Sequence, residues 1–73
     1  MSAKLNDSKW KSIFSGNNNF KLENFSFSMM IGRLSRKFKK DPSLLKECIE
    51  EANSFCSKYE SILGNDLAKL KNA

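Results

Sequence analysis

The chain has 73 residues, with 13 basic and 8 acidic side chains and therefore a net charge of +5. It contains no His and only two Cys, which excludes an imidazole base, a Cys/His zinc site and a disulfide framework. Hydrophobic residues make up 40% of the chain, too large a share for a disordered protein. We therefore expect one small domain over residues 1–73, with no enzymatic activity, no metal and no cofactor.

The sequence gives no sign of export or membrane insertion. Residues 1–7 lack the apolar stretch of a secretory signal. The longest uninterrupted apolar run is Met29-Met30-Ile31, whereas a membrane-spanning helix needs about 20 such residues. We expect a cytoplasmic protein.

The first predicted helix covers residues 7–15. Asp7 or Ser8 suits its N-cap, and Gly16, followed by three Asn residues, is a natural stop at its other end. So short a helix must dock on the rest of the chain. The docking stripe has the helical spacing i, i+3, i+4 and consists of Trp10, Ile13 and Phe14.

Residues 20–29 fit two patterns. An alternation of apolar and polar residues suits a strand, and its apolar members are Phe25, Phe27 and Met29. A longer series suits a helix, and its members are Phe27, Ile31, Leu34 and Phe38. Because the helical series continues into good helix formers, we predict a helix over residues 25–39 with Asn24 or Ser26 as its N-cap.

The third segment has the most regular apolar pattern of the chain. Asp41 is a suitable N-cap, and Pro42 suits the first helical turn. Apolar residues then recur at alternating steps of three and four, at Leu45, Cys48, Ala52, Phe55, Tyr59 and Ile62. This spacing predicts a long amphipathic helix over residues 43–63.

Gly64 is expected to end this long helix. A short tail helix over residues 66–71 would follow, capped by Asn65 or Asp66. The alternative is a single helix that continues through Gly64, since one Gly costs a helix only about 1 kcal/mol.

Both cysteines lie on the apolar side of the predicted long helix. Cys48 and Cys56 are eight residues apart, which corresponds to about 12 Å along a helix axis. A disulfide requires Cα atoms within about 7 Å of each other. We therefore expect two buried, reduced thiols.

These elements predict an all-α fold, either a helical hairpin or a small three-helix bundle with a long C-terminal amphipathic helix. A helix over residues 43–63 would be about 31 Å long, whereas a compact chain of this length is roughly 29 Å across. The helix would overhang its own molecule, so we expect self-association, most simply as a homodimer. A compact three-helix monomer is the alternative.

An apolar seam on the third helix, with aromatic residues at the start of the second, would make the contact. Its residues are Phe25, Phe27, Phe55, Tyr59, Ile62 and Leu63. The seam predicts a non-enzymatic protein-binding module, such as a regulator, an adaptor or a chaperone-like subunit. Its partner would be a second copy or another protein.

The excess positive charge lies in residues 33–40, at the C-terminal end of the second predicted helix. Four basic residues share one face of it, namely Arg33, Arg36, Lys37 and Lys40. Such a face binds nucleic-acid phosphates, an acidic protein or, less readily here, an anionic membrane surface. It can also be simply solvated, with some charges paired to the acidic cluster of Glu47, Glu50 and Glu51. A nucleic-acid-binding regulator is therefore the alternative function.

A different architecture would serve that alternative. A strand over residues 20–27, followed by helices over residues 29–39 and 43–57, has the element order of a dimeric ribbon-helix-helix DNA-binding protein. The large apolar residues of the strand speak against it. The pattern is otherwise too general to indicate a family.

Overall fold

Helices make up all the regular structure in residues 4–16 and 20–72, the part of the chain that the computed structural model describes. In chain order they are α1 (Asp7–Phe14), α2 (Phe25–Lys40), the 3-10 turn η1 (Pro42–Leu44), α3 (Leu45–Lys58) and α4 (Gly64–Lys71). The predicted all-α class is confirmed. The ribbon-helix-helix alternative is wrong, because no strand occurs in the described residues and α2 already begins at Phe25.

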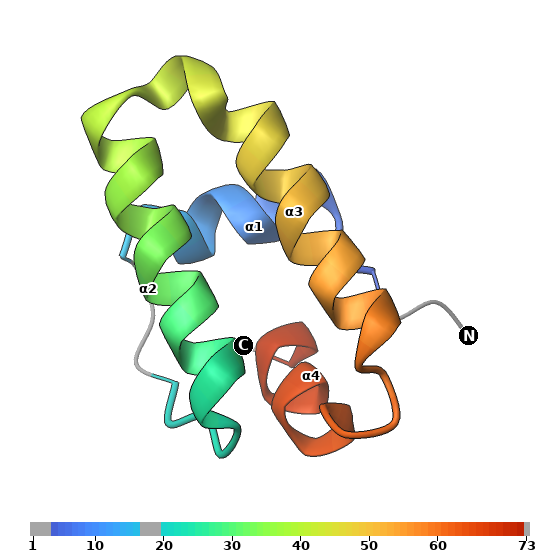
Figure 1. The fold of residues 1–73 in the computed structure, drawn as a ribbon. Coiled ribbons are helices and arrows are strands. Elements are labelled where there is room, and N and C mark those ends of the chain that lie inside the picture. Colours follow the sequence, from blue (N-terminus) through green and yellow to red (C-terminus); the bar gives the residue numbers. More distant parts are fainter. Residues whose placement is uncertain (1–3, 17–19, 73) are drawn as a thin grey trace.

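The two longest helices form the frame of the molecule. α2 and α3 lie side by side and run in opposite directions, while α1 crosses behind them and α4 folds back at their open end (Figure 1). The helices and the turn before α4 all contribute to one core. Its largest fully buried side chains include Trp10, Phe14, Phe27, Leu34, Leu63 and Leu70.

Local hydrogen bonds fix both ends of α1. The N-cap is Asn6 and not the predicted Asp7 or Ser8, because the Asn6 Oδ1 accepts the backbone N–H of Lys9 at 2.8 Å. At the other end, Gly16 has a φ of +85°, which Gly adopts without strain. The three Asn residues that follow Gly16 lie outside the described residues.

In α2 the helical spacing prevails over the alternating pattern. Asn24 caps the helix, with its Oδ1 accepting the backbone N–H of Phe27 at 2.9 Å. Phe27 and Ile31 are buried, whereas Phe25 and Met29 are exposed. The residues that alternate in the sequence therefore lie on different faces, as a period of 3.6 residues requires.

Asp41 and Pro42 separate α2 from α3. Asp41 leaves the helical region with a φ of −144°, which is usual for a residue before Pro. Its Oδ1 accepts the backbone N–H of Ser43 at 3.2 Å and the Ser43 hydroxyl at 2.6 Å. Asp41 thus caps the next element, and Pro42 occupies a position where a backbone N–H is not needed.

The predicted helix over residues 43–63 is wrong. α3 ends at Lys58, and the N–H groups of Ile62 and Leu63 donate to the Tyr59 carbonyl, each at 3.0 Å, which closes a turn. Gly64, expected to end a helix, begins α4 instead.

Burial of leucine side chains explains this break. The turn brings Leu63, Leu67 and Leu70 into the core, whereas a straight helix would carry them away from it. Burying each leucine is worth about 1.5–3 kcal/mol, more than the net 0.5–1.5 kcal/mol of each backbone hydrogen bond that the break removes. The shortened α3, about 21 Å long, fits within a molecule of 31 × 21 × 20 Å. The expected overhang is therefore absent.

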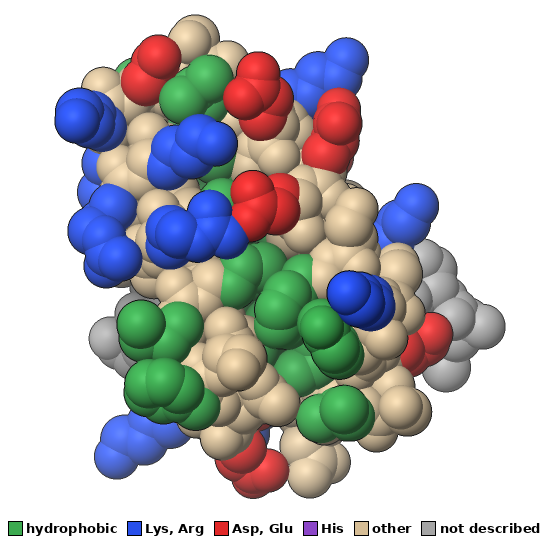
Figure 2. All heavy atoms as spheres, in the orientation of Figure 1, with side chains coloured by type: hydrophobic (Ala, Val, Ile, Leu, Met, Phe, Trp, Pro, Cys, Tyr) green, Lys and Arg blue, Asp and Glu red, His purple; other side chains and the backbone are tan. Residues whose placement is uncertain are grey.

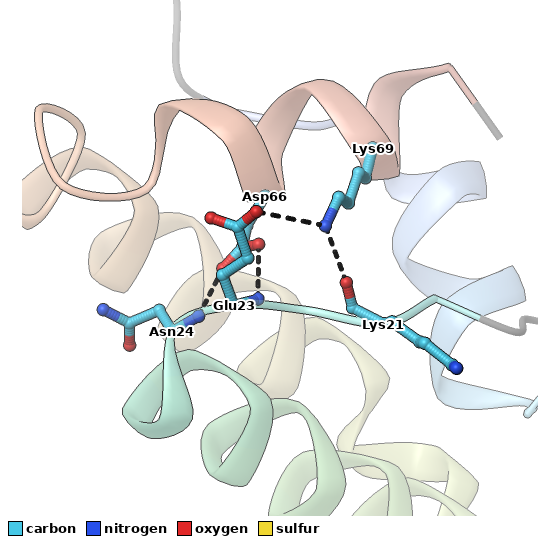
Figure 3. A network of polar contacts seen from close by, with 5 residues as sticks. All are labelled: Lys21, Glu23, Asn24, Asp66 and Lys69. Carbon is cyan, nitrogen blue, oxygen red and sulfur yellow. Dashed lines mark hydrogen bonds and ion pairs between the residues drawn. The ribbon is translucent and has the colours of Figure 1, made fainter.

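Asp66 fastens the segment before α2 to α4 (Figure 3). This residue was predicted as a possible helix cap, but its side chain is buried, with 2% exposed. Its two carboxylate oxygens accept the backbone N–H groups of Glu23 at 2.8 Å and Asn24 at 2.9 Å. Lys69 adds a bond from its Nζ to the Lys21 carbonyl at 2.8 Å. The entry to α2 is thus held by α4.

Asn53 has a similar role at the N-terminal end. Its Oδ1 accepts the backbone N–H of Leu5 at 3.1 Å and the indole N–H of Trp10 at 2.8 Å. A single amide on α3 therefore satisfies two donors and fastens both α1 and the segment before it.

We predict that Asp66→Ala lowers the free energy of unfolding by about 1.5–3 kcal/mol, because two backbone donors lose a charged acceptor. Urea unfolding followed by circular dichroism measures this loss. Asn65→Ala, at an exposed neighbouring position of α4, is the matched control and should change the midpoint little. Equal midpoints for the two variants would contradict the role assigned to Asp66.

Candidate protein-binding groove

The six predicted seam residues divide into two groups. Phe25 and Ile62 are exposed, and Phe55 and Tyr59 are half-buried. Phe27 and Leu63 are fully buried, so the prediction that these two contact a partner is wrong. Phe27 lies on the inward face of α2, and the turn after α3 directs Leu63 into the core.

Stacked aromatic rings give the exposed group a firm floor. The Phe55 ring stacks on Phe27, with centroids 5.7 Å apart and planes at 11°. The Tyr59 ring packs against the Phe55 ring, with centroids 4.8 Å apart. The Lys58 Nζ lies 5.4 Å from the Tyr59 ring centroid, a cation–π contact that helps to hold the ring.

Two adjoining hollows lie over this floor. One, of about 470 Å³, is lined by α2 residues that include Phe25, Met29 and Arg33. The other, of about 390 Å³, is lined by residues that include Tyr59 and Ile62. Both are also lined by Phe55 and Ser26, so the two hollows adjoin each other between α2 and the end of α3, and together they are treated as one groove.

We call this surface the apolar groove and define it by Phe25, Met29, Phe55, Tyr59 and Ile62. The exposed fractions of Phe25, Met29 and Ile62 are 77%, 55% and 66%. Figure 2 shows hydrophobic side chains gathered on the lower half of this face, over both long helices. Met29 was absent from the predicted seam, although its position one turn after Phe25 in a helix could have indicated it.

The predicted basic face lies on α2 beyond the apolar groove. Arg33, Arg36, Lys37 and Lys40 are all exposed. Arg33 forms an ion pair with Glu51 of α3, one of the acidic residues that the sequence offered as a partner. Within the described part of the chain, Arg36 and Lys40 form no ion pair.

The order of residues along the two helices explains this layout. On α2, Phe25 and Met29 precede Arg36 and Lys40 at spacings that keep all four on one face. On α3, which runs the other way, acidic residues precede Phe55 at steps of four, namely Glu47 and Glu51. One half of the face is therefore apolar. The other half is basic along α2 and acidic along α3 (Figure 2).

The two cysteines are free and buried, as predicted. The Cys48 Sγ lies 3.8 Å from the Leu34 carbonyl, its acceptor in the core. Burial raises the pKa of Cys48, and it raises the pKa of Cys56 from 9.0 to about 11. Both thiols therefore stay protonated near neutral pH and are poor nucleophiles.

A third hollow, of about 580 Å³, lies beside α3 and the N-terminal segment. Its lining includes Lys4, Asp7, Glu50 and Ser54. In the described ranges there is no group of three or more His, Cys, Asp or Glu residues that could hold a metal ion. Nor is any described helix long and apolar enough to cross a membrane.

Comparison with protein-family models, with curated proteins and with solved structures gives no match. The function must therefore be inferred from the geometry of this face.

We predict that neither thiol reacts measurably with a disulfide reagent in the native protein at pH 8, and that both react once urea unfolds it. The reason is that burial removes access and suppresses the thiolate. Release of the coloured thiolate, followed by absorbance, counts the reactive groups. Rapid release of one equivalent from the native chain would contradict the placement of these residues.

Proposed function

We propose that the protein is a non-enzymatic protein-binding module of the cytosol, acting as a regulator, an adaptor or a chaperone-like subunit through the apolar groove. The observation that carries this proposal is the exposure of Phe25, Met29 and Ile62 around one groove. Scattered apolar residues are ordinary on a protein surface, whereas a contiguous patch with a polar rim is typical of a binding surface.

The residue types of the groove favour a protein as its partner. Aromatic and Met side chains are enriched at the centres of protein interfaces, and an unbranched Met such as Met29 adapts to the shape of what it contacts. The rim supplies charges for orientation, from Arg33 and Arg36.

The nucleic-acid alternative has weaker support. The Glu51 carboxylate already neutralises Arg33, and the acidic residues on α3 would repel phosphates approaching the same face. Residues 20–27, which a ribbon-helix-helix protein would place as a strand in the major groove, form an irregular segment, the Asn24 cap and the start of α2 in this chain.

In-cell photocrosslinking tests the proposed function. The photoreactive amino acid p-benzoylphenylalanine replaces Ile62 at the rim of the groove. As a matched control it replaces Lys46, which is exposed on α3 beside the third hollow. We expect protein adducts from position 62 and not from position 46. Adding Phe25→Asp should lower their yield by about tenfold or more, because a central apolar contact is lost.

Two results of this experiment would contradict the proposed function. One is an equal adduct yield from positions 62 and 46. The other is a yield from position 62 that Phe25→Asp leaves unchanged.

Fluorescence anisotropy with a labelled DNA duplex tests the alternative. We predict no saturable binding even at 50 mM salt, because Glu51 already pairs with Arg33 of the basic face and the α3 carboxylates lie on the same face. A nucleic-acid-binding protein would instead bind at 50 mM salt, lose affinity steeply towards 200 mM and weaken further on Arg36→Ala and Lys40→Ala.

Pelleting with anionic vesicles serves as the parallel test of a membrane surface, and no cosedimentation is expected.

A further inference from the structure

The face that carries the apolar groove has an asymmetric rim. Arg36 and Lys40 are exposed on α2, and Glu47 is exposed on α3. Within the described residues, none of these three forms an ion pair. The charges are therefore available to a partner, which must present acidic groups to α2 and basic groups to α3 while covering the apolar half.

A second copy of the same face meets all of these requirements. Two identical faces can stack about a two-fold axis that lies in the face and runs between α2 and α3 along their length. This rotation exchanges the α2 side with the α3 side and leaves the apolar half opposite the apolar half. Arg36 and Lys40 of one copy then face Glu47 of the other, and the reverse contact forms by symmetry.

Other two-fold arrangements of the face lack this match. An in-plane axis perpendicular to the two helices would set the apolar half of one copy against the charged half of the other. An axis perpendicular to the face would not stack the two faces at all. The order of apolar, basic and acidic residues therefore selects one axis. The ion pair of Arg33 and Glu51 spans α2 and α3, so it lies near that axis.

We propose that the partner of the apolar groove is a second copy of this chain, bound as an isologous homodimer in which α2 of each copy packs on α3 of the other. This inference rests on the proposed function, because it uses the same groove. It does not depend on the length of α3, which lies within its own molecule.

Charge reversal tests both the dimer and its axis. Sedimentation equilibrium of the full chain should give the mass of a dimer at about 100 µM protein. Arg36→Glu and Glu47→Arg should each weaken the dimer by about tenfold or more, because like charges then face each other twice in the assembly. An equimolar mixture of these two variants should restore the dimer, since the introduced charges face each other at one contact and the native pair persists at the other.

Lys46→Glu is the matched control, because it reverses an exposed charge of the same helix away from this face. It should leave the dimer intact. Restoration in the mixture also shows that both variants fold, so a failure to fold cannot imitate the expected result.

Each other outcome overturns the proposal. A wild-type chain that stays monomeric at about 500 µM rules out a second copy as the physiological partner of the apolar groove. The proposed function would nevertheless stand if position 62 still forms adducts whose mass shows a different protein. A dimer that resists both reversals, or a mixture of the two variants that stays monomeric, rules out the proposed axis.

Discussion

Burial of Leu63, Leu67 and Leu70 requires the chain to turn back after α3, and the rest of the structure depends on that turn. α4 lies at the open end of the frame that α2 and α3 form (Figure 1), and all three side chains are buried. Because α4 then lies against the entry to α2, Asp66 can accept the backbone N–H groups there. A chain of this size hides only about 60% of its surface, so these buried groups are a large part of its stability.

The same turn creates the functional surface. Of the neighbours Ile62 and Leu63, the second points into the core and the first stays outside. Ile62 thus joins Phe25 and Met29 around Phe55, whose ring is fixed between two others. A rigid aromatic floor between adaptable apolar side chains costs little entropy when a partner binds. The charged half of the face adds orientation, which apolar contact alone does not provide.

Helical periodicity in the sequence indicated the all-α class and the apolar residues of α1 and α2, because in each of those helices a single stripe of side chains packs into the core. Two residues of the predicted seam, Phe25 and Ile62, are exposed. The periodicity failed beyond Lys58, where the same stripe continues through Leu70 although the chain reverses direction. Beyond Lys58 the helical period does not separate buried from exposed residues, because Ile62 of the predicted stripe is exposed and its neighbour Leu63 is buried. The roles of Asn53 and Asp66 were missed because their partners lie more than forty residues away.

Solvent relaxation measured by NMR with a soluble gadolinium chelate tests the central claim most directly. In dilute protein, the account predicts strong relaxation of the Phe25, Met29 and Ile62 side chains and little of Phe27 and Leu63. As the protein concentration rises, the three exposed side chains should become protected while exposed Lys46 stays unchanged. Relaxation of Leu63 as strong as that of Ile62, or no protection of the groove at any concentration, would contradict the account.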